Sequence, residues 1–289
     1  MQTEVVKPPV GINPRVGSLP HALQALHAIV MREVLKFVQQ RGRLLSALVR
    51  PVLWLAVFAA GFRNVFGVAI VEPYDTYIPY DVYIAPGLIG MVLLFNGMQS
   101  SLAMVYDREM GLMRLLLTAP LPRWWLLFSK LCATALLSLL QVVAFVIVAA
   151  LIGTALPVAG WPLLHALVAT LAAALMLASL GLLLSVYVKQ LENFAGTMNF
   201  VIFPMYFLST ALYPLWKLEE SGATWVYRVA QFNPFTHAVE WIRFALYDKD
   251  PGLAPWVVLA TLAVCFTLAC WGYDPQRGFG GLTKRGGPA

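Results

Sequence analysis

Long apolar stretches alternate with short polar segments along the chain. A helix needs roughly 20 predominantly apolar residues to cross the core of a bilayer. The apolar stretches predict six membrane-spanning helices, at about 44–66, 84–106, 124–153, 163–188, 194–212 and 256–273. The pattern therefore predicts an all-α polytopic membrane protein in which residues 44–273 form one six-span domain.

The first of these spans is the least regular. Arg50 and Arg63 enclose only twelve uncharged residues, which correspond to about 18 Å of helix. Because a bilayer core is about 30 Å thick, both arginines are expected to snorkel to the surface or to be shielded by neighbouring helices.

A basic amphipathic helix is predicted at residues 19–43, after a flexible tail at residues 1–18. One face carries Leu19, Leu23, Leu26, Val30, Val34 and Phe37, and the opposite face carries Arg32, Lys36 and Gln39. The helix is too polar to span, so the pattern favours a position in the membrane interface. A cytosolic docking helix is the alternative.

The segment between the last two predicted spans is not a simple loop. Residues 224–247 contain two short apolar pieces separated by Asn233 and Pro234. The residue before a proline disfavours helix, so two half-helices are expected to dip into the outer leaflet and return. A helix lying flat on the outer surface, lined by interfacial Trp and Tyr, is the alternative.

Several side chains of this segment have expected places. Trp225 and Trp241 are expected at the outer membrane interface. The charged residues Arg228, Glu240 and Arg243 are expected at the outer leaflet, paired with one another and lining the exit of a path.

Composition and charge support the membrane assignment and add an orientation. The 289 residues are 60% hydrophobic and 12% charged, about half the charged fraction of a soluble domain. With both termini inside, fifteen Lys and Arg residues lie on the inner side and five on the outer side. Because positive residues concentrate on the cytoplasmic side, both termini are predicted to be cytosolic. The location predicted is the plasma membrane, here a bacterial inner membrane.

The sequence offers no catalytic or metal-binding constellation. There is no phosphate-binding loop, and the glycine-rich end, residues 274–289, is interpreted as a flexible basic tail. His237 and Glu240 lie one helical turn apart and are interpreted as a satisfied polar pair. Cys132, Cys265 and Cys270 all lie in apolar runs, so they are interpreted as small buried side chains.

Polar residues inside the predicted spans are neutral rather than acidic. They are Asn96, Gln99, Ser100, Ser101, Gln141 and Asn199. Such residues face a bundle interior or a transport path, and simple hydrogen bonding between helices is an equally open interpretation. Since no acidic residue lies within the six spans, a proton- or sodium-driven relay is not indicated.

A mixed-charge stretch interrupts the apolar pattern between the second and third spans. It reads VYDREMGLMRLLLTAPLPRWWLLFSK, residues 105–130. We expect a short cytosolic helix at 107–117, ended by Pro120 and Pro122, with Trp124 and Trp125 at the membrane interface. A helix held between two spans can act as a lever, because a partner that pushes it moves both spans.

This stretch resembles the cytosolic loop of type-2 ABC-transporter permeases, whose pattern is D-R-E-x-G, a Leu-rich helix, a P-x-x-R turn and a Lys. The matching residues are Asp107, Arg108, Glu109, Gly111, Pro120, Arg123 and Lys130. FLSTALYPLW (207–216) and NPFTHAVEWIR (233–243) resemble two further family segments. The family often has an acidic residue where this chain has Met113 or Arg114. A more distant similarity is to permeases associated with quinoprotein alcohol-oxidation systems.

The resemblance implies a permease subunit of an ATP-driven ABC transporter that works as an exporter. It implies two cytosolic ATPase subunits that bind ATP and Mg, and a second permease copy, giving a homodimer in membrane lipid. This chain itself would be no enzyme, hold no cofactor and bind no nucleic acid. The residues implied in ATPase coupling are Asp107, Arg108, Glu109, Gly111, Arg114 and Pro120. Candidate path residues are Asn96, Gln99, Asn199, Asn233, Glu240 and Arg243.

Three other classes of membrane protein are alternatives to an ABC permease. A membrane-embedded enzyme should carry clustered carboxylates or histidines near one membrane face, and the sequence has none. A secondary transporter should carry intramembrane charges and repeated halves. A non-transporting membrane assembly subunit stays open, as do the transported substrate and the choice between homodimer and heterodimer.

Overall fold

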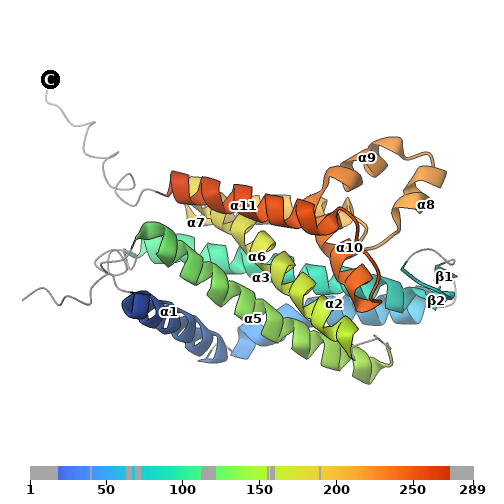
Figure 1. Cartoon of the computed structure of the whole chain (residues 1–289), viewed down its shortest axis with the longest axis horizontal. Coiled ribbons are helices and arrows are strands. Elements are labelled where there is room, and N and C mark those ends of the chain that lie inside the picture. Colours follow the sequence, from blue (N-terminus) through green and yellow to red (C-terminus); the bar gives the residue numbers. More distant parts are fainter. Residues whose placement is uncertain are drawn as a thin grey trace, which may run out of the picture.

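The computed structural model describes residues 19–39, 41–62, 67–68, 73–111, 122–154, 156, 160–188 and 190–273. Helices make up most of this part of the chain, and Figure 1 shows them gathered into an elongated bundle. The helices are α1 (Leu19–Gln39), α2 (Arg41–Phe62), α3 (Tyr80–Glu109), α5 (Arg123–Ile152), α6 (Trp161–Tyr187), α7 (Leu191–Phe207), α8 (Leu215–Glu220), α9 (Thr224–Phe232), α10 (Pro234–Leu246) and α11 (Ala254–Gly272). Two short antiparallel strands, β1 (Gly67–Val68) and β2 (Ile78–Pro79), precede α3.

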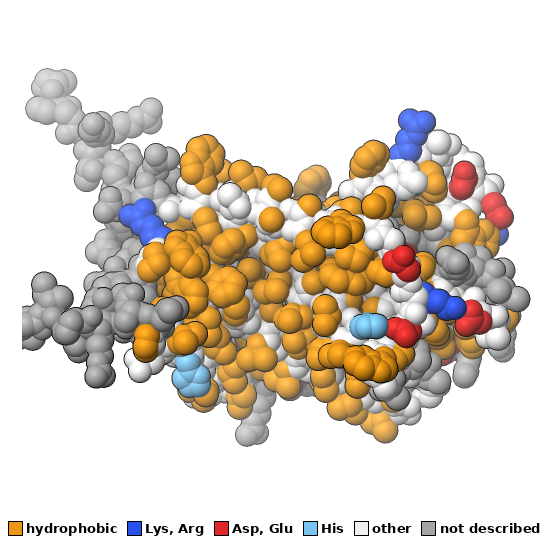
Figure 2. All heavy atoms as spheres, in the orientation of Figure 1, with side chains coloured by type: hydrophobic (Ala, Val, Ile, Leu, Met, Phe, Trp, Pro, Cys, Tyr) orange, Lys and Arg blue, Asp and Glu red, His pale blue; other side chains and the backbone are white. Residues whose placement is uncertain are grey.

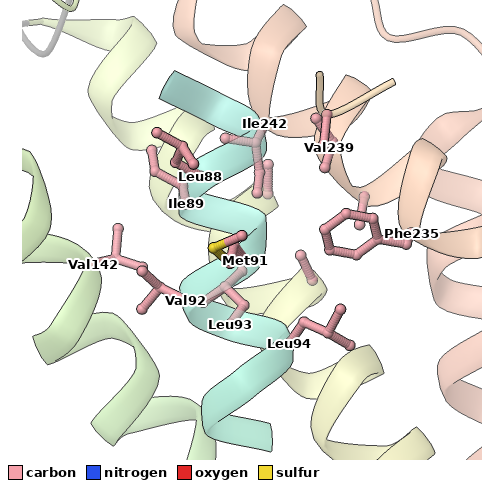
Figure 3. Packing of buried hydrophobic residues seen from close by; sticks show 14 of the residues in the cluster. Leu88, Ile89, Met91, Val92, Leu93, Leu94, Val142, Phe235, Val239 and Ile242 are labelled. Carbon is pink, nitrogen blue, oxygen red and sulfur yellow. The ribbon is translucent and has the colours of Figure 1, made fainter. Parts of the chain in front are cut away.

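Helix α3 lies at the centre of the bundle. It packs against α2, α5, α6, α7 and α10, and most of its side chains are buried. In Figure 3, Val142 of α5 lies on one side of α3 and Phe235 and Val239 of α10 lie on the other. A single apolar core therefore connects helices that are far apart in the sequence.

Small residues allow α3 and α6 to approach closely. A methyl group added at Gly97 would lie 3.1 Å from the backbone of Leu177 and Ala178, and one added at Gly181 would lie 2.9 Å from the Gly97 carbonyl. Close backbone approach at small residues is a common mode of helix packing in membranes. This crossing fixes the centre of the bundle.

Within the described residues, four helices are long and apolar enough to cross a membrane: α3, α5, α6 and α11. They match four of the six predicted spans. The apolar part of α2 is the shorter Leu48–Phe58, and α7 has 17 residues. Figure 2 shows apolar side chains across the middle of the face in view and charged side chains toward its ends.

The irregular first span behaves partly as expected. The Arg50 guanidinium lies over the Phe95 ring, 3.8 Å from the ring centroid, so α3 shields this charge through a cation–π contact. Pro51 lies inside α2 and directly follows Arg50. Arg63 lies outside the described residues, so its expected shielding stays a prediction.

Several predicted boundaries differ from those of the structure. The predicted helix 19–43 ends at Gln39, and α2 begins at Arg41. The predicted span 84–106 is longer at both ends, because α3 begins at Tyr80 and continues to Glu109. The predicted span 194–212 ends earlier, because α7 stops at Phe207, and the short helix α8 was not predicted. Both predicted tails, 1–18 and 274–289, lie outside the described residues.

Candidate functional site

The C-terminal end of α3 holds a buried carboxylate surrounded by cations. The Asp107 side chain is 6% exposed, and its Oδ2 lies 3.1 Å from Arg32 Nη2 and 3.5 Å from Lys130 Nζ. Its Oδ1 lies 3.8 Å from Lys36 Nζ. Arg32 and Lys36 belong to α1 and Lys130 to α5, so Asp107 links three helices at this end of the bundle.

This position corrects an expectation from the sequence. Asp107 was expected on the face of a separate cytosolic helix at 107–117, but residues 107–109 form the last turn of α3. The helix continues because its last turn is held by contacts with α1, α5 and the α6–α7 turn. Residues 112–120, and with them Arg114 and Pro120, lie outside the described residues, so their predicted coupling role stays a prediction.

The next two residues of α3 contact the turn between α6 and α7. Arg108 Nη2 donates to the Val188 carbonyl over 3.0 Å, and the Leu191 backbone N–H donates to Glu109 Oε1 over 2.8 Å. Val188 follows α6 and Leu191 begins α7. A carboxylate at a helix N-terminus accepts a hydrogen bond from a free N–H, and its negative charge interacts favourably with the positive end of the helix dipole. The end of α3 therefore holds the start of α7.

Helix α3 ends directly after this contact. The Met110 N–H donates to the Tyr106 carbonyl, and Gly111 has a φ of +72°. Glycine tolerates this left-handed conformation without steric cost, so Gly111 turns the chain out of the helix. The role of Gly111 in ATPase coupling, which the family resemblance implies, stays a prediction.

The predicted break at Asn233 and Pro234 is present. Helix α9 ends at Phe232 and α10 begins at Pro234. Asn233 caps α10, because its Oδ1 accepts from the Phe235 N–H over 3.0 Å. Its Nδ2 donates to the carbonyls of Met205 and Leu208, each over 2.7 Å. One side chain thus satisfies backbone groups freed at the break and at the end of α7, and residues 224–247 are not one continuous helix.

Arg243 is buried among side chains of several elements. Its side chain is 2% exposed, and it forms an ion pair and hydrogen bond with Glu240. Its Nη2 donates to the Thr210 carbonyl over 2.9 Å and lies 3.5 Å from the Tyr83 carbonyl oxygen. The guanidinium also lies over the Tyr83 ring, 4.1 Å from the centroid. The predicted Glu240–Arg243 pair is confirmed, and the predicted place of Arg243 along the exit of a path stays a prediction.

Arg228, the third charged residue expected in this group, lies on the separate helix α9. Arg228 is exposed on α9, and Trp225 there is 68% exposed. His237 does not pair with Glu240 as predicted, because its Nε2 lies 2.9 Å from the Gln231 carbonyl oxygen. Glu240 instead turns toward Arg243, whose buried charge is the stronger partner.

A tyrosine cluster surrounds Arg243. Tyr74 packs edge-on against Tyr247 with ring centroids 4.9 Å apart, and Tyr80 stacks on Tyr83 at 6.2 Å. Burial raises the pKa of the Tyr74 phenol above its usual range, so this side chain remains neutral at physiological pH. The hydroxyl of Tyr80 donates to the Leu212 carbonyl. These contacts join α3, α10 and the α7–α8 connection.

Polar residues in the middle of the bundle mainly bond helices together. Asn96 Nδ2 donates to Ser138 Oγ over 2.7 Å, and Ser100 Oγ lies 2.6 Å from Thr134 Oγ1. These contacts join α3 to α5, which favours the hydrogen-bonding interpretation of Asn96. Gln141 is fully buried, and its amide has no hydrogen-bond partner among the described residues.

The candidate path residues are not brought to one place within a single chain. Asn96 is buried at the α3–α5 contact, Gln99 is half-buried on α3, and Asn199 is exposed on α7. Asn233 and Arg243 belong to the segment 224–247 and contact the C-terminal end of α7 and the residues that follow it. In the part of the chain that the structure describes, no group of three His, Cys, Asp or Glu side chains could hold a metal.

Sequence reasoning missed two sets of contacts. Trp125 Nε1 donates to the Ala22 carbonyl over 2.9 Å, which fixes α1 against α5. At the outer end, His165 Nδ1 lies 2.7 Å from Asp248 Oδ1. The partners in each pair are more than 80 residues apart, and helical periodicity carries no signal for such pairing.

Fold and contacts together define a polytopic α-helical membrane protein in which charged side chains link α1, α3 and α5. Residues 24–247 match the family described as ABC-2 type transporter, so the chain belongs to this family. As a member, it is a membrane permease of an ABC transporter, and such permeases associate with ABC ATPases.

Three relatives carry the name "Putative transport permease ycf38". The Porphyra purpurea protein is 29% identical over 229 residues, which cover 79% of this chain and 76% of the relative. The Cyanophora paradoxa protein is 29% identical over 236 residues, covering 80% and 77%. The Pyropia yezoensis protein is 27% identical over 237 residues, covering 78% and 75%.

Proposed function

We propose that this permease works as an exporter, driven by two separate cytosolic ATPase subunits that bind ATP and Mg²⁺. The observation that carries the proposal is the contact of Arg108 and Glu109 with the α6–α7 turn. A partner that moves the chain just after Glu109 would move the start of α7 as well. This is the lever that a transporter powered from outside the membrane requires.

The proposal includes six spans, with α2 and α7 as the two shorter ones. Trp54 of α2 contacts Tyr206 and Phe207 of α7, with ring centroids 6.3 Å and 6.0 Å apart. This contact sets both helices beside each other against the central α3. A 17-residue helix is about 26 Å long, so α7 with the turn that follows it can cross most of a bilayer core. Helices α9 and α10 then form a re-entrant pair in the outer leaflet.

A second copy of the chain is proposed to cover one face of α7. Asn193, Gly196 and Asn199 are exposed on this helix, next to the largely exposed Phe200. Amide side chains facing lipid are costly, whereas small and amide residues favour contact between membrane helices. A homodimer would place these groups at the contact or along the path between the two copies.

Co-purification tests the ATPase partnership. We expect the tagged full chain, isolated from its native membranes in mild detergent, to bring with it a phosphate-loop ATPase and measurable ATP hydrolysis. Lys217→Ala, an exposed change on α8 at the other end of the bundle, should leave both unchanged. Isolation of the chain in a folded state without any ATPase, even after crosslinking in the membrane, would contradict the proposal.

The proposed orientation places both termini and Met110 in the cytosol of a bacterial cell and α8 outside it. In a variant that lacks the three native cysteines, an impermeant maleimide should label Glu219→Cys in intact cells. Met110 is 58% exposed at the end of α3, so Met110→Cys should react with the maleimide. It should do so only after permeabilisation, because the proposed orientation places it in the cytosol. The reverse labelling pattern would show that the orientation is inverted.

A further inference from the structure

Helix α1 exposes an apolar stripe although its other apolar face is already packed. Phe37 is buried against the bundle, whereas Leu23, Met31, Leu35 and Val38 are between 43% and 61% exposed. Met31, Leu35 and Val38 follow one another at spacings of four and three, so they share one helix face. This stripe needs an apolar environment outside the bundle.

Two cations beside this stripe remain accessible although they contact Asp107. The side chains of Arg32 and Lys36 are 36% and 40% exposed. A guanidinium carries five N–H donors. The Lys36 ammonium lies 3.8 Å from Asp107 and 4.0 Å from Glu33, which is longer than a hydrogen bond. Both cations therefore have donors available for another anion.

The charge of this cluster is also unbalanced. Among the described residues, Arg32, Lys36 and Lys130 pair only with the carboxylates of Asp107 and Glu33. Three cations against two carboxylates leave one positive charge in excess. An additional anion at the surface of the cluster would balance it.

The cluster lies at the level where lipid headgroups are expected. Trp124 and Trp125 begin α5, and such aromatic residues are enriched at the membrane interface. Trp125 donates to the Ala22 carbonyl of α1, and Figure 1 shows α1 beside the first part of α5. Arg32 and Lys36 are thus held near the headgroups, with the apolar stripe of α1 beside them.

We propose that Arg32 and Lys36 bind the phosphate of an anionic phospholipid, whose acyl chains lie against Met31, Leu35 and Val38. A phosphate accepts charge-assisted hydrogen bonds from both side chains, and basic residues at the membrane surface favour anionic lipids. The site rests on α1 lying in the membrane interface, the position that its sequence pattern favours. It requires no ATPase and no particular transported substrate.

Quenching of tryptophan fluorescence by brominated lipids tests this site. The full chain is reconstituted in phosphatidylcholine vesicles that contain a small fraction of brominated phosphatidylglycerol or brominated phosphatidylcholine. The tryptophan fluorescence of the wild-type chain should be quenched at a lower fraction of brominated phosphatidylglycerol than of brominated phosphatidylcholine. Arg32→Gln and Lys36→Gln should each reduce this preference about fivefold, the effect of one cation near an anionic surface. Lys217→Gln at the outer end should not change it.

Asp107→Asn separates lipid binding from a purely structural role. It frees Arg32 and Lys36 from their carboxylate, so the preference for phosphatidylglycerol should be kept or increased. If the two cations only hold α1 in place, Asp107→Asn should instead reduce the preference for phosphatidylglycerol, as Arg32→Gln does. Equal quenching of the wild-type chain by both lipids would overturn the proposal and would favour a soluble protein as the partner of this face. Both leaflets contain the same lipids, so an inverted orientation would not affect the result.

Discussion

The Arg243→Ala variant is expected to lose about 3 kcal/mol of stability, because removing one partner of a buried ion pair leaves the other charge uncompensated. Arg243 is 2% exposed and pairs with Glu240 on the same helix. Its guanidinium also donates to the Thr210 carbonyl at the α7–α8 connection. The variant therefore leaves both a carboxylate and a buried carbonyl without their donor. Unfolding of the detergent-solubilised protein, followed by tryptophan fluorescence during heating, measures the loss.

Two further variants define what this loss means. Arg228→Ala removes an exposed arginine from α9 and should change stability by less than about 0.5 kcal/mol, as surface substitutions do. Arg243→Met combined with Glu240→Leu removes both charges and should be more stable than Arg243→Ala alone, because no buried charge is left unpaired. If Arg243→Ala unfolded at the same temperature as Arg228→Ala, the buried arginine would not hold α10 to α3 and α7.

The features that the sequence predicted well are those set by neighbouring residues. The apolar lengths of α3, α5, α6 and α11 follow from local composition. The break between α9 and α10 follows from the Asn233-Pro234 pair, since a proline restricts the residue before it and asparagine is a preferred helix cap. Even the cap itself, with the Phe235 N–H donating to Asn233, is a contact between near neighbours.

The features that the sequence did not predict depend on partners far along the chain. Asp107 was expected in a separate cytosolic helix, but it is buried, and its partner Arg32 lies 75 residues earlier. Its burial extends α3 to Glu109 and removes the boundary expected at residue 107. In the same way, Arg243 is buried because Tyr83 and Thr210, on other elements, supply acceptors for it. Periodicity places a residue on a helix face and says nothing about which distant group meets that face.

The largest functional effect is expected at the contact between α3 and α7. Glu109→Ala removes the acceptor of the Leu191 N–H, the charge-assisted hydrogen bond that fixes the start of α7 to the end of α3. Under the proposed function, the ATPase should still bind, while ATP-driven movement of α7 should fall about tenfold or more. A cysteine at Asn199, which is exposed on α7, reports this movement without knowledge of the substrate. The measurement compares its labelling rate by a maleimide in the presence and absence of ATP and vanadate.

Three comparisons make this test specific to the contact. Glu109→Gln keeps a side-chain oxygen that can accept from Leu191, so it should retain more of the ATP-dependent change than Glu109→Ala. Glu192→Ala removes an exposed carboxylate from the first turn of α7 and should behave like the unchanged protein. Arg108→Gln weakens the neighbouring contact with Val188 and should give an intermediate loss. If Glu109→Ala kept the full ATP-dependent change at Asn199, the end of α3 would not transmit motion to α7, and the coupling would have to pass through the residues that follow Gly111 by another route.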